Sequence, residues 1–236
     1  MGFVLLEGGS EFKAGMAAAD KRAMAAVGGQ RGAIRIIPAA AAPDGNDLRA
    51  GANGVAWFHA LGATDVQALP IVDRVSADRP EHAAELEAAG IVFMLGGFTR
   101  YLAETLSGSR AWEATKSAHR AGALIGGSSA GAMVLCEFYF DQASGRVFPG
   151  LNLLPEVCVL PHHDTFGKEW AARLARLLPG ALLIGIDEET GLLNDGPRRL
   201  WTVYGKGAVT VYEPGGRTKF HHGQCFALPI AVKDHP

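Results

Sequence analysis

The sequence predicts an α/β fold of three layers, in which a doubly wound and mostly parallel sheet lies between two layers of helices. Short apolar runs rich in β-branched residues alternate with Ala-rich segments whose apolar residues recur at helical spacing. This alternation is typical of βαβ crossovers. The runs are apolar at almost every position, as expected of parallel strands that are covered on both faces.

The expected elements follow one another in a regular order. Strands should begin at Phe3, Ala33, Val66, Ile91 and Ala123. Helices should lie between them, over residues 14–28, 51–63, 80–90 and 109–122. After residue 129 the pattern changes, and we expect strands at 157–163 and 182–193, a helix at 168–178 and a C-terminal β-hairpin over the alternating residues 198–216. Because no linker, repeat or low-complexity tract interrupts the chain, we expect a single domain over residues 1–236.

The composition is that of an ordinary globular protein. Of its 236 residues, 48% are hydrophobic and 19% are charged, and the formal net charge is -2. This balance gives no electrostatic basis for binding nucleic acid or an anionic membrane surface. We therefore expect a small molecule or a peptide as the partner.

The three cysteines are widely spaced and form neither a zinc pattern nor a disulfide framework. We expect buried free thiols at Cys136, Cys158 and Cys225, with no metal and no cofactor. The N-terminus lacks the basic lead and long apolar stretch of a signal peptide, and no apolar run approaches the roughly 20 residues of a membrane helix. A cytoplasmic location is expected from these features.

Residues 125–135, IGGSSAGAMVL, contain the pattern G-x-S-x-G between an expected strand and an expected helix. In this context Ser129 would lie on a sharp, strained turn with its hydroxyl exposed beyond the sheet, as a nucleophile does. Gly127 and Gly131 would avoid collisions across the turn, and the backbone N–H of Ala130 would face an oxyanion. A turn that only connects the two elements or binds phosphate is the alternative, and Ser128 is a weaker candidate nucleophile.

A serine nucleophile requires a base, which is usually histidine. His162 and His163 end an expected strand, and adjacent strand residues face opposite ways, so one of the two could reach Ser129. A carboxylate that orients the histidine could come from residues 187–189, Asp-Glu-Glu, at the end of another expected strand. Asp164 and Asp141 are weaker candidates for this carboxylate.

Four segments in order resemble peptidase family S51, the family of peptidase E and cyanophycinase. They are GGSSAGA at residues 126–132, LGGFTRYLAETL at 95–106, LPHHDTF at 160–166 and GIDEETGLL at 185–193. The resemblance implies a fold similar to that of class I glutamine amidotransferases, which is flavodoxin-like, with serine in place of the usual cysteine nucleophile. It also implies a serine peptidase that cleaves small peptides as a dipeptidase or exopeptidase, and it makes a homodimer possible.

The resemblance assigns roles to particular residues. It implies a catalytic set of Ser129, His162 and Glu188, and it places a second oxyanion donor at the N–H of Gly97 beside that of Ala130. The residues expected to contact substrate are Gly96, Phe98, Thr99, His163 and Trp170. Trp170 stands where Asp-selective relatives carry an arginine, so we do not expect a strict Asp-X dipeptidase unless Arg100 or Arg173 replaces that arginine.

Other functions fit parts of the pattern. An esterase of the α/β-hydrolase type would use the order Ser, Asp or Glu, late His, with Asp187 or Asp195 and with His221 or His222. A catalytically silent binding relative would keep the fold without the chemistry. A glutamine amidotransferase would need a cysteine nucleophile, whereas Cys136 is expected two turns into the helix that follows Ser129.

Overall fold

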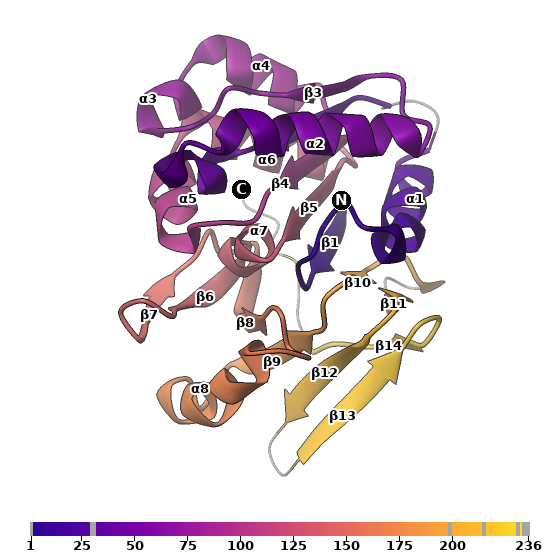
Figure 1. The fold of residues 1–236 in the computed structure, drawn as a ribbon, viewed down its shortest axis with the longest axis vertical. Coiled ribbons are helices and arrows are strands. Elements are labelled where there is room, and N and C mark those ends of the chain that lie inside the picture. Colours follow the sequence, from indigo (N-terminus) through magenta and orange to yellow (C-terminus); the bar gives the residue numbers. More distant parts are fainter. Residues whose placement is uncertain (1, 29–31, 198–199, 214–215, 230–231, 233–236) are drawn as a thin grey trace.

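The strands form two mixed sheets rather than the single sheet that the sequence predicts. The computed structural model describes residues 2–28, 32–197, 200–213, 216–229 and 232 (Figure 1). One sheet has eight strands in the order β14-β11-β10-β1-β5-β4-β2-β3, and the other has six in the order β13-β12-β9-β8-β6-β7. The α/β class is confirmed, and the expectation of one mostly parallel sheet is corrected to two mixed sheets.

The first sheet has a parallel half built from the strands predicted in the N-terminal part of the chain. This half consists of β1 (Phe3–Glu7), β2 (Ile34–Ile37), β3 (Val66–Ala68), β4 (Ile91–Met94) and β5 (Leu124–Ser128). Its strands pair in parallel, and β1 and β4 both lie beside β5. Beyond β1 the sheet continues in antiparallel pairing with β10 (Thr190–Leu193), β11 (Trp201–Gly205) and β14 (Cys225–Phe226).

Helices cover both faces of the first sheet (Figure 1). On one face lie η1 (Ala14–Met16), α1 (Ala17–Ala26) and α2 (Asp47–Ala60), and Phe58 of α2 packs with Leu5 and Phe93. The other face contacts α3 (Arg74–Ala77), α4 (Pro80–Glu87), α5 (Thr99–Leu106), α6 (Arg110–Arg120) and α7 (Ala130–Val134). The 3₁₀ segment η2 (Ala39–Asp44) follows β2. The predicted helices of this half are therefore confirmed.

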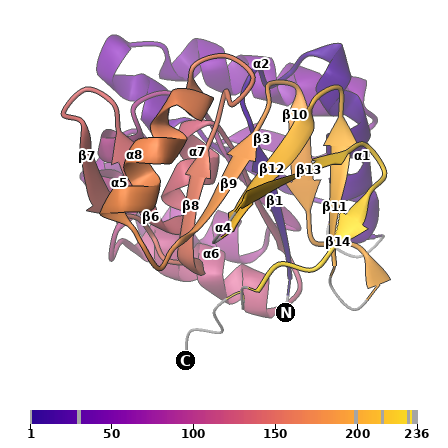
Figure 2. The same cartoon turned by 90° about the horizontal axis from the view of Figure 1, so that it is seen from below.

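The second sheet consists of β6 (Cys136–Asp141), β7 (Arg146–Pro149), β8 (Leu154–Leu160), β9 (Leu182–Ile186), β12 (Ala208–Glu213) and β13 (Gly216–His221). One of its faces shares the core of α4 to α7 through residues such as Val159 and Ile184. The other face carries η3 (Gly167–Trp170) and α8 (Ala171–Leu177), where Leu174 packs with Leu160 and Leu183 (Figure 2).

Three predictions in the C-terminal half are corrected. Residues 182–193 are two strands in different sheets, β9 and β10, joined by a turn at residues 187–189. Strand β11 pairs with β10 and β14, and the hairpin forms instead between β12 and β13, with Ala208 opposite His221. Residues 198–199 and 214–215 of the predicted hairpin lie outside the described residues. Helix α7 ends at Val134, whose carbonyl accepts the Leu151 N–H, so Cys136 begins β6.

The cysteines differ from one another in burial. Cys136 and Cys158 are buried free thiols as predicted, and burial raises the pKa of Cys158 to about 12. Cys225 is exposed, which corrects that part of the prediction. In the described part of the chain, no helix has the length and apolar character needed to cross a membrane.

Candidate active site

Ser129 occupies a strained turn between β5 and α7. Its φ of 49° and ψ of -108° are unusual for a residue with a side chain. A Cβ atom at Gly127 would lie 2.4 Å from the carbonyl carbon of Gly131, and one at Gly131 would lie 2.2 Å from the carbonyl oxygen of Met94. Both glycines are therefore required for the close approach of β4, β5 and α7, and this geometry is that of a nucleophile elbow.

His162 follows β8 and reaches the serine. Its Nε2 lies 3.0 Å from Ser129 Oγ. The backbone N–H of His162 donates to the carbonyl of Gly8 at 2.7 Å, and the imidazole stacks on Phe166 with ring centroids 5.0 Å apart. The histidine is thus held from its backbone and from one ring face.

His163 faces away from Ser129, but strand alternation is not the reason, because β8 ends at Leu160 and His162 lies in the turn after it with a φ of 50°. His163 is buried, with Nδ1 3.3 Å from Asp187 Oδ1 and Nε2 2.8 Å from the Tyr212 hydroxyl. This position corrects the expectation that His163 contacts substrate. Burial alone would raise the pKa of Asp187, but hydrogen bonds from His163 and from the Ala208 N–H lower it below its usual value.

Glu188 completes a continuous hydrogen-bonded chain. Its Oε1 lies 2.7 Å from His162 Nδ1. The hydrogen bonds from His162 and Ser10 lower the pKa of Glu188, so the carboxylate is ionised at neutral pH and accepts a hydrogen bond from the Nδ1–H of His162. Because Nδ1–H of His162 donates to Glu188, Nε2 is the ring nitrogen that can accept the Ser129 hydroxyl proton.

The other acidic candidates have different partners. Asp187 binds His163 and the Ala208 N–H, and Glu189 binds Lys206 and the Gly15 N–H. Asp164 accepts the backbone N–H of Glu188 at 2.9 Å and so supports the turn that carries it. Because residues 187–189 form a turn, strand alternation could not have separated the three carboxylates.

The last residue of β1 and the loop that follows it together contact Ser129, His162 and Glu188, and sequence reasoning missed these contacts. The carbonyl of Glu7 accepts the Ser129 N–H at 3.0 Å, and that of Gly9 accepts the Glu189 N–H at 3.1 Å. The Ser10 hydroxyl donates to Glu188 Oε2 at 2.7 Å. The available signal was the Gly8-Gly9 pair at the end of a central strand, since loops at the carboxyl ends of neighbouring parallel strands meet at one edge.

Two backbone N–H groups flank Ser129. Ala130 begins α7, and Gly97 has a φ of 136°, where a Cβ atom would lie 2.3 Å from the Ala40 carbonyl oxygen. The neighbouring Phe98 N–H is occupied, because it donates to that carbonyl at 2.8 Å. The N–H groups of Gly97 and Ala130 have no hydrogen-bond partner among the described residues, so both can donate to a ligand.

A cavity of about 710 Å³ opens beside Ser129 and His162. Its aromatic and apolar wall consists of Phe98, Met133, Phe140, Phe166 and Trp170, and the remaining lining residues are Gly97, Thr99, Asp141, Gln142, Ala143 and Pro161. Gly96 lies just outside this wall, where a Cβ atom would be 3.4 Å from that of Ser129. Neither lysine nor arginine is among the described lining residues.

Arg100 and Arg173, which could have replaced the arginine of Asp-selective relatives, have other partners. Arg173 lies over the Phe140 ring and donates to the carbonyl of Gly145. Arg100 pairs with Glu104 at 2.8 Å. Neither one lines the cavity, and Asp141 is the one acidic side chain among its described lining residues.

The residues of the alternative functions do not converge on Ser129. Ser128 is buried and donates to Glu11 Oε2 at 3.0 Å. His222 accepts the Gly205 N–H through Nδ1 and contacts the Tyr204 ring. Within the described ranges, no group of three or more His, Cys, Asp or Glu side chains is arranged to hold a metal ion.

Two carboxyl groups are buried together on the α1 side of β1. Glu7 is fully buried, and Asp20 of α1 accepts a hydrogen bond from Trp57 Nε1 at 2.8 Å. Burial and repulsion from Asp20 raise the pKa of Glu7 well above its usual value. Burial also raises the pKa of Asp20, to about 6. Both carboxyl groups therefore keep their protons to a higher pH than exposed carboxyl groups do.

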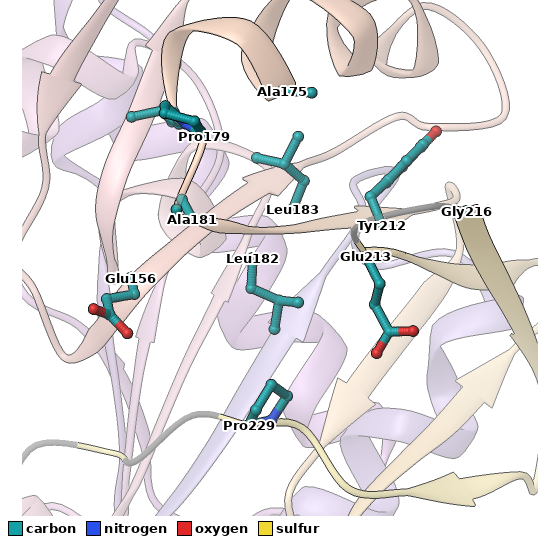
Figure 3. A pocket seen from close by; sticks show the side chains of 12 residues that line it. Glu156, Ala175, Pro179, Ala181, Leu182, Leu183, Tyr212, Glu213, Gly216 and Pro229 are labelled. Atoms are coloured by element: carbon teal, nitrogen blue, oxygen red, sulfur yellow. The ribbon is translucent and has the colours of Figure 1, made fainter.

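A second cavity, of about 570 Å³, lies between α8, β9, β12 and the C-terminal segment (Figure 3). In Figure 3 Leu182 lies between Glu156 and Glu213, with Pro229 close by. None of Ser129, His162 and Glu188 lines this cavity. The candidate site is therefore the first cavity.

Comparisons with known proteins agree with this geometry. Residues 4–199 match peptidase family S51. The chain is 29% identical to a cyanophycinase of Geminocystis herdmanii over 97% of its own length and 87% of the relative's. It is 31% identical to a cyanophycinase of Trichormus variabilis over 89% of its own length and 73% of that relative's.

Solved structures give the same result. A peptidase from an acI-B1 Actinobacterium superposes with a TM-score of 0.87 and 26% identity, over 97% of each chain. A putative peptidase E from Listeria monocytogenes has the same fold at a TM-score of 0.64 and 18% identity, with 88% of this chain and all of that one aligned. The family match spans well over half of the sequence, and it agrees with the turn geometry at Ser129 and with the similarity to cyanophycinases. The chain therefore belongs to peptidase family S51.

Proposed function

We propose that the protein is a serine peptidase that hydrolyses small peptides, as a dipeptidase or another exopeptidase, through an acyl-enzyme on Ser129. The observation that supports this most strongly is the continuous chain from Ser129 Oγ to His162 Nε2 at 3.0 Å and from His162 Nδ1 to Glu188 Oε1 at 2.7 Å. Such a chain activates a hydroxyl that is otherwise a weak nucleophile at neutral pH.

The proposed reaction has two halves. Ser129 Oγ attacks the peptide carbonyl and passes its proton to His162 Nε2, while ionised Glu188 stabilises the imidazolium. The N–H groups of Gly97 and Ala130 donate to the oxyanion that develops. His162 then protonates the leaving amine, and a water molecule activated by the same histidine releases the acyl group.

The cavity supports a preference among substrate side chains. Its wall offers aromatic surface from Phe98, Phe166 and Trp170, together with one carboxylate, Asp141. We propose that the side chain bound there is uncharged or cationic, because a second carboxylate would be desolvated without a cation to pair with it. The similarity to proteins named peptidase and cyanophycinase supports a peptide rather than an ester as the substrate.

The test is a screen of dipeptides and blocked amino-acid substrates with the purified protein and with Ser129→Ala. We expect turnover by the wild-type protein and a loss of about 10³-fold or more in Ser129→Ala, with an unchanged Tm, because the missing hydroxyl leaves no core cavity. Activity of Ser129→Ala within about tenfold of the wild-type value, and well above that of a mock purification, would contradict the proposal.

A further inference from the structure

The carboxylate of Glu188 has a second hydrogen-bond donor besides the histidine. While Oε1 accepts from His162, Oε2 accepts from the Ser10 hydroxyl at 2.7 Å. Ser10 belongs to the loop after β1, far from Glu188 in the sequence. Lys13 Nζ lies 3.3 Å from the same hydroxyl, which adds a cation on the side of Ser10.

Glu188 requires such an anchor more than a buried carboxylate would. Its side chain is 31% exposed, compared with 8% for Asp187 beside it. The terminal torsion of a glutamate has a broad minimum, and a free glutamate loses considerable rotamer entropy when it is fixed. A single bond to His162 therefore leaves the carboxylate free to rotate toward solvent.

The backbone fixes the Ser10 hydroxyl where it is needed. The carbonyls of Gly8 and Gly9 accept the N–H groups of His162 and Glu189, so the two residues before Ser10 are tied to the elements that carry the base and the carboxylate. Ser10 itself has a φ of 56°, a conformation that costs a residue with a side chain free energy and that glycine adopts readily.

We propose that Ser10 is a positioning residue of the active site, which holds the Glu188 carboxylate in the orientation that accepts the hydrogen bond from His162 Nδ1–H. This role rests on the proposed function of Ser129, His162 and Glu188. A hydroxyl that donates to a carboxylate forms a short, charge-assisted bond and stabilises the ionised form. Removing it should therefore change both the rate and its dependence on pH.

The experiment uses Ser10→Gly, which removes the hydroxyl and relieves the backbone strain. We expect kcat to fall about tenfold, equivalent to about 1.4 kcal/mol of activation free energy, with KM within about twofold of the wild-type value. The acid limb of the kcat profile should move to higher pH, because Glu188 then takes up its proton at higher pH. Tm should not fall.

Asn152→Gly is the matched control, because Asn152 also has a φ of 56° and lies in the loop between β7 and β8. It should keep the wild-type kcat and pH profile. Ser10→Thr, which keeps a hydroxyl but adds strain, should be less stable than Ser10→Gly and yet more active. A purely structural role predicts the opposite order of activities.

The outcomes separate the two proposals. If Ser129→Ala is inactive and Ser10→Gly retains the wild-type kcat and pH profile, the role of Ser10 is refuted while the catalytic chain stands. If Ser129→Ala remains active, the proposed function fails first. An equal loss of activity in Ser10→Gly and Asn152→Gly would also refute the role of Ser10.

Discussion

Replacing Gly9 by alanine should displace the His162 imidazole without removing any catalytic group. Gly9 has a φ of 110°, and a Cβ atom there would lie 2.3 Å from Cε1 of His162 and 2.6 Å from its Nε2. Because the ring is also stacked on Phe166 and hydrogen-bonded to Glu188, it cannot move without changing its position relative to Ser129.

The size of the effect follows from these distances. Ordinary contacts of a Cβ atom begin at 3.4 Å, so the ring or the loop must shift by an amount on the order of 1 Å. A misplacement of roughly 1 Å in a catalytic group can cost on the order of 10²-fold in rate. The positive φ separately lowers the stability of an alanine variant by about 1–2 kcal/mol.

Gly62→Ala separates the two effects, because Gly62 has a similar φ of 105° and no atom within 4 Å of the new Cβ. The assay is the rate at which a fluorophosphonate modifies the protein, which needs an activated serine but no knowledge of the substrate. Both variants should lose stability in urea, Gly9→Ala at least as much as Gly62→Ala, while Gly9→Ala alone reacts about 10²-fold more slowly. Equal reaction rates in the two variants would refute the reasoning.

The free energy of unfolding should fall as the pH rises, because Glu7 and Asp20 hold their protons more tightly in the folded protein than in the unfolded chain. In Asp20→Asn this fall should be smaller. The Asp20 contribution is complete below pH 3.8 and is lost as the pH rises through about 6. Asp20 contributes at most about 3 kcal/mol to the free energy of unfolding. Urea unfolding of both proteins from pH 4 to 8 measures this contribution. If the free energy of unfolding changed with pH equally in the wild-type protein and in Asp20→Asn, the prediction would be contradicted. Gly131→Ala should lower Tm and abolish fluorophosphonate labelling, since its Cβ would lie 2.2 Å from a backbone oxygen, and an unchanged Tm would argue against the tight turn. Substrates with aspartate in the cavity should have kcat/KM at least about tenfold below those with leucine, because Asp141 repels them; a preference for aspartate would show that a cation reaches the cavity.

The first half of the fold was predictable because its signals are local. Each strand from Phe3 to Ser128 is a short apolar run, and each helix that follows has its own periodic apolar face. The elbow at Ser129 was equally local, since a strand, a tight turn with two glycines and a helix lie within eleven residues. Neighbouring strands of this half are joined by helical crossovers, which dictate parallel pairing.

The second half depends on pairings between distant strands. Nothing in residues 182–193 indicates that β9 joins one sheet and β10 another, because both parts are equally apolar. Likewise, β11 and β12 look like a hairpin, but β11 takes β10 as its partner. Such choices are made by long-range packing, which periodicity does not report.

The site was predicted in its main residues and missed in its supporting loop. The family resemblance selected His162 over His163 and Glu188 over its acidic neighbours, because both sets lie in turns where strand alternation does not apply. Residues 8–10 carry no side chain typical of catalysis apart from one serine. Their role arises from the position of β1 beside β5, and that position becomes visible only in the folded chain.

The most direct test of the account is to locate the adduct that a fluorophosphonate forms with the folded protein. Mass spectrometry of the digested protein should find one modified residue, Ser129, in the wild-type protein and in Ser128→Ala. His162→Ala should react at least about 10³-fold more slowly, since the base is missing. An adduct on another residue, or labelling of Ser129→Ala at the wild-type rate, would contradict the claim that Ser129 is the nucleophile.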